Sequence, residues 1–219
     1  MKSSALVLKQ EIMTTSTSSK RLIVALSGSS GIIYGIRLLE VLRRMHDVES
    51  HVVVSPAAKR TLLEETAYAV KDVEALADVV YDYRDIGAAL ASGSFHTHGM
   101  IVAPCSIKTM SSLALCLADN LITRAGDVTL KEGRPLLVAV RETPLHVGHL
   151  RLMTQLAEMG GIIFPPVPAF YNRPQTIDDL VNNTVGRILD RMGLPDHDLV
   201  REWRGTHSPR TTRDNQEEE

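Results

Sequence analysis

The sequence is poor in cysteine and lacks any long hydrophobic run. Cys105 and Cys116 are its two cysteines, and neither a CxxC pair nor histidines at zinc-finger spacing accompany them. This argues against a disulfide framework or a structural metal and fits the reducing cytoplasm best. The longest apolar runs, such as Leu22 to Leu26 and Met100 to Ala103, have the length of strands. A membrane helix needs roughly 20 apolar residues, so we expect no segment to span a bilayer.

The sequence also lacks an excess of charge of either sign. Its 24 Lys and Arg residues nearly balance 26 Asp and Glu residues, for a net charge of -2, and no basic block stands out. This argues against nucleic-acid binding, whereas a few well-placed Arg and Lys side chains can still hold a small anion. Histidine pairs occur at His96 and His98 and at His146 and His149, without a third ligand at usable spacing. We therefore expect no metal site.

The length of the chain and the composition of its two terminal segments predict a single domain with a flexible segment at each end. A chain of 219 residues suits a single α/β domain with a full core. Residues 1–20 lack the apolar stretch of a secretory signal and contain Glu11, which transit peptides avoid, so we interpret them as a flexible extension. Residues 206–219 are polar and end in acidic residues, which predicts a disordered tail. The domain is expected at residues 21–205.

Short apolar runs alternate with amphipathic segments along this domain. Arg21 to Leu26 and His51 to Ser55 are predicted strands, and Gly31 to Met45 between them has apolar residues at helical spacing. Pro56 suits the first turn of a helix to about Tyr68, because its missing N–H needs no partner there. Further strands are expected at residues 100–103, 135–140 and 161–164, and a closing helix at residues 180–192. This alternation predicts a doubly wound, mostly parallel α/β sheet whose ligands lie beyond the carboxyl ends of its strands.

Two turn motifs follow predicted strands at that edge. The first, Ser27-Gly28-Ser29-Ser30-Gly31, leads into a helix. Its small residues admit a ligand close to the backbone, and free N–H groups at a helix start favour an anion such as phosphate. The second, residues 104–109, offers Ser106 as a helix cap, and Ser106 and Thr109 as phosphate donors. Either motif alone is also typical of an ordinary turn or cap, and the first is no GxGxxG fingerprint. Cys105 has no assignable base, so we expect it to be packed rather than nucleophilic.

Charged residues supply further candidates. Arg141 and Glu142 follow a predicted strand, where a doubly wound fold places its ligands. Arg124 and Lys131 are seven apart on a predicted helix and share one face of it. Taken singly, Arg124 and Lys131 are typical of a solvated surface, whereas charges at the position of Arg141 and Glu142 are seldom accidental.

Two loops complete the set of candidates. Residues 91–95 form a small-residue loop that either admits a planar ligand or is only a turn. Residues 165–174 contain four prolines, which predict a stiff wall carrying Phe170 and Tyr171. Arg187 and Trp203 are possible additional contacts, or a surface residue and a packed one.

Six segments in order carry a resemblance to a known family. They are SGSSG, ASGSF, PCSIKT, RAGDVTLKEGRPL, VRETPL and PAFYNRP, within about Arg21 to Trp203. Together they resemble the UbiX-type flavin prenyltransferases, including the small subunits of phenolic acid decarboxylases. The resemblance implies a flavodoxin-like or Rossmann-like three-layer sandwich that joins a dimethylallyl group from dimethylallyl phosphate to N5 and C6 of reduced FMN. It also implies a homo-oligomer such as a dodecamer, and a partner UbiD-type decarboxylase that receives the prenylated FMN.

The resemblance implies roles for individual residues. FMN would be held by Gly28, Ser29, Ser30, Ser55, Ser106, Ile107, Lys108, Thr109 and Arg141. The prenyl phosphate would be contacted by Ser92, Arg124, Lys131, Tyr171, Arg187 and Trp203. The catalytic residues would be Ser30, Glu65, Lys131 and Glu142, with Glu65 or Glu142 accepting the C6 proton. Donors of the Arg, Lys and Tyr type can stabilise a leaving phosphate, so no metal is required.

Two other functions stay open at the level of sequence. One is a non-catalytic FMN-binding subunit of a phenolic acid decarboxylase, although retained Lys131 and Arg187 argue for activity. The other is a flavin-dependent cysteine-type decarboxylase, which usually needs a histidine in the first helix, and residues 31–42 contain none. A departure from the usual family pattern occurs at residues 146–150, where Gly148 is expected to loosen a helix start.

Overall fold

Among residues 19–195 and 197–199, which the computed structural model describes, six strands form one parallel sheet in the order β3-β2-β1-β4-β5-β6. The strands are β1 (Lys20–Leu26), β2 (Val48–Val54), β3 (Val79–Tyr81), β4 (Gly99–Cys105), β5 (Leu136–Val140) and β6 (Gly161–Ile163). β1 lies between β2 and β4, with Ala25 opposite both Val53 and Val102. The strand order reverses between β1 and β4, so the carboxyl ends of these two strands form the switch point of the sheet.

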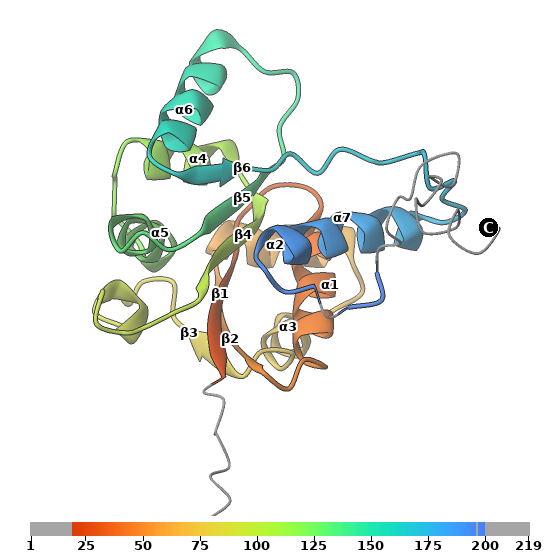
Figure 1. The fold of residues 1–219 in the computed structure, drawn as a ribbon, viewed down its shortest axis with the longest axis horizontal. Helices are drawn as coiled ribbons and strands as arrows, with labels where there is room; N and C mark the ends of the chain where they lie inside the picture. Colours follow the sequence, from red (N-terminus) through yellow and green to blue (C-terminus); the bar gives the residue numbers. More distant parts are fainter. Residues whose placement is uncertain (1–18, 196, 200–219) are drawn as a thin grey trace, which may run out of the picture.

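Helices cover both faces of this sheet (Figure 1). One face carries α1 (Ile32–Leu42), α2 (Pro56–Glu65), α3 (Val70–Glu74) and α7 (Ile177–Arg191). The other carries α4 (Ile107–Ala114), α5 (Leu121–Lys131) and α6 (Val147–Glu158). A short 3-10 turn, Ala89–Ala91, lies between β3 and β4. The arrangement confirms the predicted doubly wound, flavodoxin-like α/β sandwich.

The central strands are apolar on both faces because both faces are covered. All seven residues of β4 and all five of β5 are buried. Along β4, Ile101 packs in the cluster under α1 and α7, whereas Val102 packs in the cluster under α4 and α5. Each fully buried side chain of this size contributes about 1.5–3 kcal/mol, so the two clusters hold the layers together. Within the described part of the chain, no helix is long and apolar enough to cross a membrane.

Two short elements, α3 and β3, are missing from the sequence prediction. They contain five and three residues, too few to display a periodicity. β3 exists through its pairing with His51 to Val53 of β2, a contact between residues far apart in sequence. The other boundaries shift slightly: α1 ends at Leu42 because the residues up to Met45 continue as turns.

Two glycines place the start of α1 beside the switch point. Gly31 precedes the helix with φ of 91°, in the left-handed region where glycine is favoured. A Cβ built on Gly35 would be 2.4 Å from the carbonyl oxygen of Ala103 in β4, so only glycine permits this close contact of helix and strand. The loop after β1 and the end of β4 are therefore held together.

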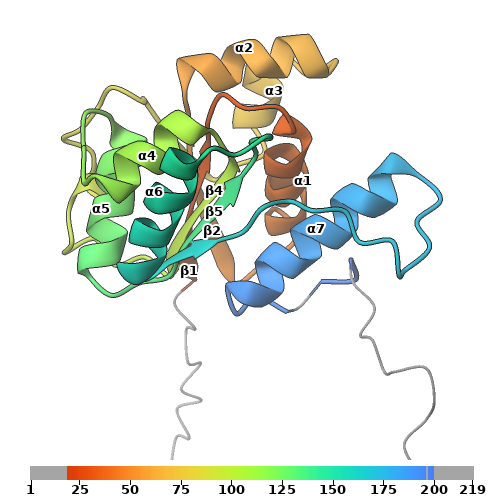
Figure 2. The ribbon, with the colours of Figure 1, turned by 90° about the horizontal axis from the view of Figure 1, so that it is seen from above.

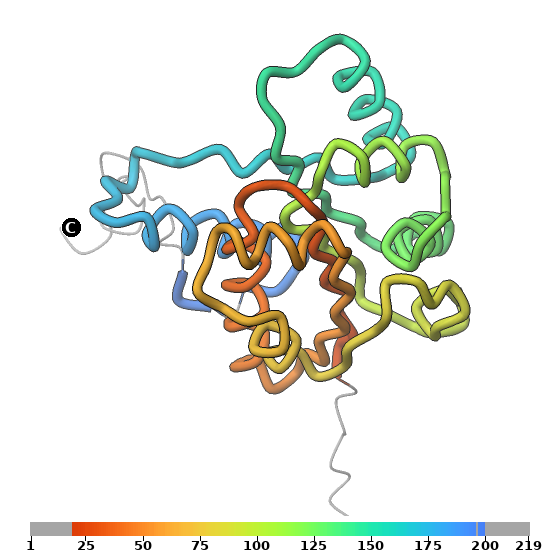
Figure 3. The backbone as a smooth tube through the Cα atoms, turned by 180° about the vertical axis from the view of Figure 1, so that it is seen from behind, coloured from red at the N-terminus to blue at the C-terminus, as the bar shows by residue number. Residues whose placement is uncertain are grey.

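Residues 164–176, which we call the arm, connect β6 to α7. The arm leaves the body of the molecule and ends at the start of α7, which runs back toward the sheet (Figures 1 and 3). Its prolines restrict the backbone, and its side chains Val167, Phe170 and Tyr171 are exposed. The arm is thus an extended segment, as its proline content predicts.

Candidate functional site

The carboxyl ends of β1 and β4 are joined by one buried serine. The backbone N–H of Ser27 and its hydroxyl both donate to the carbonyl oxygen of Pro104, at 3.1 and 3.0 Å. The backbone N–H of Ser106 in turn donates to the Ser27 hydroxyl at 2.7 Å. Two loops that are distant in sequence therefore have a fixed separation at the switch point.

Two helix starts point to the same place. Ser55 caps α2 by accepting from the N–H of Ala58 at 3.0 Å. Ser106 caps α4 by accepting from the N–H of Thr109 at 3.3 Å, and its hydroxyl donates to Thr109 Oγ1 at 3.1 Å. The cap by Ser106 was predicted from sequence, whereas Ser55 was predicted only as the end of the strand before the Pro56 helix. Each helix start favours a negatively charged group.

A pocket of about 380 Å³ lies between these helix starts. It is lined by Gly28, Ser55, Pro56, Ala57, Tyr83, Ser106, Lys108 and Thr109. Five predicted FMN residues, Gly28, Ser55, Ser106, Lys108 and Thr109, thus meet in one pocket. Ser29 lies next to Gly28, and its buried hydroxyl has no hydrogen-bond partner within the part of the chain that the structure describes. Hydroxyls, two helix starts and an ammonium group fit a phosphate-bearing ligand such as FMN.

Three other predicted FMN residues, Ser30, Ile107 and Arg141, are not among the residues that line this pocket. Ser30 is exposed in the loop before α1, and Ile107 is partly buried against the core under α4. Arg141 is exposed and follows β5, with its backbone N–H donating to Cys105 at 3.0 Å. Burial raises the pKa of Tyr34 on α1, while a hydrogen bond with Thr184 and the charge of Arg141 oppose that rise. Arg141 therefore acts electrostatically on the start of α1.

Two N–H groups at the start of α1 bond a carboxylate of the chain itself, at the position where the sequence predicted a phosphate. Glu65 Oε2 accepts from the N–H groups of Gly31 and Ile32 at 2.9 and 3.1 Å. This contact forms because α2 runs along the edge of the sheet, so that its last residue reaches α1 (Figure 2). The anion at this helix start is the protein's own carboxylate. Glu65 is thus at the rim of the site, but as a cap of α1.

Glu142 also lies at this edge of the sheet. It is exposed directly after Arg141, and its Oε1 accepts from the backbone N–H of Thr143 at 3.0 Å. Gly148 does not prevent the next helix from starting, because its N–H donates to Nδ1 of the capping residue His146 at 3.0 Å. The sequence expectation of a loosened helix start is wrong at this position.

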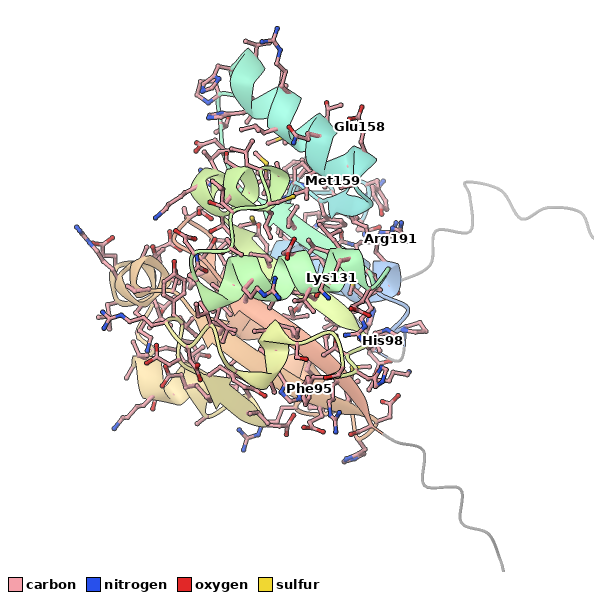
Figure 4. The ribbon with its side chains drawn as sticks, turned by 90° about the vertical axis from the view of Figure 1, so that its left-hand side faces the viewer. Phe95, His98, Lys131, Glu158, Met159 and Arg191 are labelled. Atoms are coloured by element: carbon pink, nitrogen blue, oxygen red, sulfur yellow. The ribbon has the colours of Figure 1, made fainter. Side chains whose placement is uncertain are left out.

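Lys131 and Ser92 lie together at the opposite edge of the sheet. A Cβ built on Gly93 would be 3.2 Å from Lys131 Nζ, so the loop containing Ser92 packs against the end of α5. The end of α5 leads into the beginning of β5. The backbone N–H of His98, which lies near this loop (Figure 4), donates to the carbonyl oxygen of Arg21 near the beginning of β1. Both contacts lie at the edge of the sheet where the strands begin. Lys131 Nζ bonds Glu132 at 2.9 Å and thereby lowers the pKa of that carboxyl.

The remaining predicted phosphate contacts are spread over the chain. Arg124 is on α5 and pairs with Asp127 at 2.9 Å, whereas Arg187 is on α7, across the sheet, and pairs with Asp190 at 3.5 Å. Tyr171 is on the arm. Trp203 lies outside the described residues. Among the described residues, five of the predicted FMN residues therefore line one pocket, whereas Lys131 and Ser92 lie at the opposite edge of the sheet.

Some site features were missed in the sequence and one was anticipated. Tyr83 and Ala57 line the pocket without any motif that marks them. Ser27 stands at the start of the SGSSG motif, but its buried bond to β4 depends on a distant strand. Cys105 is fully buried, which raises the pKa of its thiol and confirms the prediction of a packed residue. Within residues 19–195 and 197–199, no group of three or more His, Cys, Asp or Glu side chains could hold a metal.

The chain is similar to proteins of known families over most of its length. The family model Flavoprotein matches residues 10–189. Flavin prenyltransferase UbiX of Salmonella typhimurium is 58% identical over 187 residues, which are 85% of this chain and 99% of that protein. A dodecameric FMN-dependent UbiX-like decarboxylase from Escherichia coli O157:H7 matches with a TM-score of 0.82 and 48% identity, over 84% of this chain and all of that one. AnUbiX in complex with FMN and dimethylallyl pyrophosphate matches with a TM-score of 0.82 and 44% identity, over 86% of this chain and all of that one.

Proposed function

This chain belongs to the Flavoprotein family and, within it, to the UbiX flavin prenyltransferases, and we propose that its switch-point pocket holds the FMN that it prenylates. The enzyme joins a dimethylallyl group to N5 and C6 of reduced FMN. The observation that carries the assignment of the site is the pocket lined by Gly28, Ser55, Ser106 and Thr109, between the starts of α2 and α4. The related AnUbiX structure contains FMN together with dimethylallyl pyrophosphate, which supports both reactants.

The residues of the pocket suit the parts of FMN. We assign its phosphate to the hydroxyls of Ser55, Ser106 and Thr109 and to the two helix starts that Ser55 and Ser106 cap. Lys108 and Arg141 add positive charge at the same edge. Ile107 packs behind this wall, while Gly28, Ser29 and Ser30 form the opposite wall. Bound in reduced form, FMN supplies the nucleophilic N5 and the C6 carbon that become prenylated.

We assign two further tasks to side chains of the protein. They stabilise the negative charge of the leaving phosphate, and they accept the proton that C6 loses. Dimethylallyl phosphate reacts readily only when the charge on its departing phosphate is stabilised, and Arg124, Lys131 and Arg187 are suited to that role. Ser92, Tyr171 and Trp203 are assigned as further contacts of the same group. Glu65 or Glu142 accepts the proton that leaves C6. Oε2 of Glu65 already accepts from two N–H groups of α1, whereas Glu142 accepts from a single exposed N–H.

Two of the assigned phosphate residues lie at the opposite edge of the sheet from the pocket, so we propose that neighbouring copies complete the site. Lys131 and Ser92 are at the edge where the strands begin, and the pocket is at the edge where they end. The dodecameric UbiX-like relative supports an assembly in which one copy's edge faces another's. The exposed arm, with Tyr171, offers a second element that can reach a neighbour.

We also propose a recipient for the product, a cellular compartment, the bounds of the domain and the prenyl donor. We assign the product to a partner UbiD-type decarboxylase, and the chain to the cytoplasm. The domain is proposed to comprise residues 21–205, between tails 1–20 and 206–219, although β1 already begins at Lys20. Dimethylallyl phosphate is the proposed donor, and the diphosphate is the alternative to be tested beside it.

Mass spectrometry of released flavin tests this function. Purified protein is incubated anaerobically with reduced FMN and either dimethylallyl phosphate or its diphosphate. We expect FMN heavier by one C5H8 unit, and loss of this product in Lys131→Ala. Unchanged FMN with both donors would favour the non-catalytic subunit, and full turnover by Lys131→Ala would show that its assignment is wrong.

A further inference from the structure

We infer that Ser27 is a positioning residue that sets the width of the FMN pocket, an inference that rests on the proposed function. Ser27 is only 1% exposed, so it is placed to act on the protein rather than on a ligand. Its hydroxyl uses both of its hydrogen-bonding roles on the end of β4: it donates to Pro104 and accepts from Ser106. The two loops that form the pocket walls, at Gly28 and at Ser106, are therefore connected through one side chain.

The end of β4 needs this connection because its regular pairing stops there. The β1–β4 register extends to Ala25 opposite Val102. On its other side, β4 has an irregular register with β5 between Val102 and Cys105. Pro104 in that stretch has no N–H to donate. The backbone and the hydroxyl of Ser27 provide the remaining bonds between the two strand ends.

The effect of Ser27 reaches the pocket through Ser106. The bond from Ser27 fixes the backbone of Ser106, which caps α4. The Ser106 hydroxyl then bonds both the N–H and the hydroxyl of Thr109. Removing the Ser27 hydroxyl leaves the partly buried N–H of Ser106 without its acceptor, which costs stability. The expected result is a shift of two FMN-binding hydroxyls together.

Ser50 provides a matched control for this argument. It is also fully buried, and its hydroxyl also links two segments, donating to Asp78 Oδ2 at 2.8 Å and accepting from the Asp78 N–H at 3.0 Å. It pairs with Leu22 in the β1–β2 register, four residues before the strand end at Leu26. That places it about 13 Å from the pocket edge of the sheet.

The experiment compares Ser27→Ala with Ser50→Ala, measuring FMN dissociation constants by flavin fluorescence and thermal midpoints without FMN. Both variants should lower the midpoint, because each loses a buried hydrogen bond. Only Ser27→Ala should weaken FMN binding, by about tenfold or more, while Ser50→Ala stays within about twofold of the parent. Equal FMN affinity in the two variants, whether both are weakened or neither, overturns the inference.

A second pair keeps the test decisive if Ser27→Ala does not fold. Thr and Val have similar shapes, but only Thr has a hydroxyl. Ser27→Thr should therefore bind FMN more tightly than Ser27→Val, and equal affinities overturn the inference. If the parent chain binds no FMN, the proposed function fails as well. If the parent binds FMN and the variants match it, only the role of Ser27 fails.

Discussion

The hydroxyl of Ser29 is buried next to the pocket without a partner in the described part of the chain. A buried hydroxyl that makes no hydrogen bond costs stability, commonly about 1–3 kcal/mol. Such a cost is understandable where a bound molecule completes the bond, as we propose for FMN.

The Ser29→Ala change should therefore have opposite effects on stability and binding. Without FMN, the thermal midpoint should stay the same or rise, because the unpaired hydroxyl is removed. The FMN dissociation constant should rise by about fivefold to tenfold, as for loss of one hydrogen bond of about 1 kcal/mol. Calorimetry and flavin fluorescence measure the two quantities. Unchanged FMN affinity would contradict the assignment of Ser29 to the cofactor.

A second residue, His51 of β2, should make stability depend on pH. Its Nε2 is 3.0 Å from Glu49 Oε1, and its Nδ1 is 3.1 Å from the Tyr81 hydroxyl. Burial lowers the pKa of His51, and the positive charge of Arg21 lowers it further. The charge and hydrogen bond of Glu49 and the charge of Asp78 raise the pKa, but the net effect is a lowering. The folded state thus binds fewer protons than the unfolded state between the lowered pKa and the ordinary value of about 6.5. Stability contributed by neutral His51 is present above that value and lost as pH falls through the folded pKa.

We expect the free energy of unfolding in urea to decline from about pH 7.5 to about pH 5.5 more steeply in the parent than in His51→Gln. Subtracting the two curves removes the contributions of other titrating groups. Parallel curves would mean that burial does not shift this histidine.

At the scale of elements, α1 and α2 are joined by Glu65, whose Oε2 accepts from Gly31 and Ile32. The sequence predicts α1, α2 and the serine cap of α4, because caps and helical spacing are local signals. It does not predict that α2 runs along the edge of the sheet, because that direction depends on packing with α1. For this reason the carboxylate of Glu65 binds the N–H groups at the start of α1, where the sequence predicted a phosphate.

Two variants of Glu65 separate its capping role from proton transfer. Glu65→Ala should lower the free energy of unfolding by about 0.5–2 kcal/mol, the usual effect of losing an N-terminal cap. Glu65→Gln keeps an oxygen acceptor and should lose less, but it cannot accept a proton, so its turnover should fall sharply. Urea unfolding and flavin mass spectrometry measure the two effects. The neighbouring exposed Glu64→Gln is the control, and turnover equal to the parent in Glu65→Gln would remove Glu65 from catalysis.

At the scale of the whole molecule, the predicted site is divided between two edges of the sheet. The sequence correctly predicts that Ser106 and Arg141 follow strands, because the apolar runs show where each strand ends. Lys131 was assigned to the same reaction as these residues, but it is the last residue of α5, which leads back to the beginning of the sheet. Sequence alone cannot place neighbouring copies, so it could not indicate how these groups meet.

Mixed oligomers test this division. Lys131→Ala and Arg141→Ala should each be nearly inactive alone, since each removes one part of the site. Coexpressed with different affinity tags and purified through both tags, they should form more prenylated flavin than either variant alone. This follows because some interfaces combine an intact Lys131 from one copy with an intact Arg141 from another. Mixed oligomers as inactive as the single variants would indicate that both residues serve one chain.

The carboxylate of Glu65 at the start of α1 has a consequence for the reaction cycle. In this enzyme the flavin is itself the molecule that is prenylated, so FMN is a substrate of the reaction. Because the N–H groups of Gly31 and Ile32 are bonded by a side chain of the chain itself, departure of the product leaves these two groups paired. The scaffold can thus stay folded between one flavin and the next.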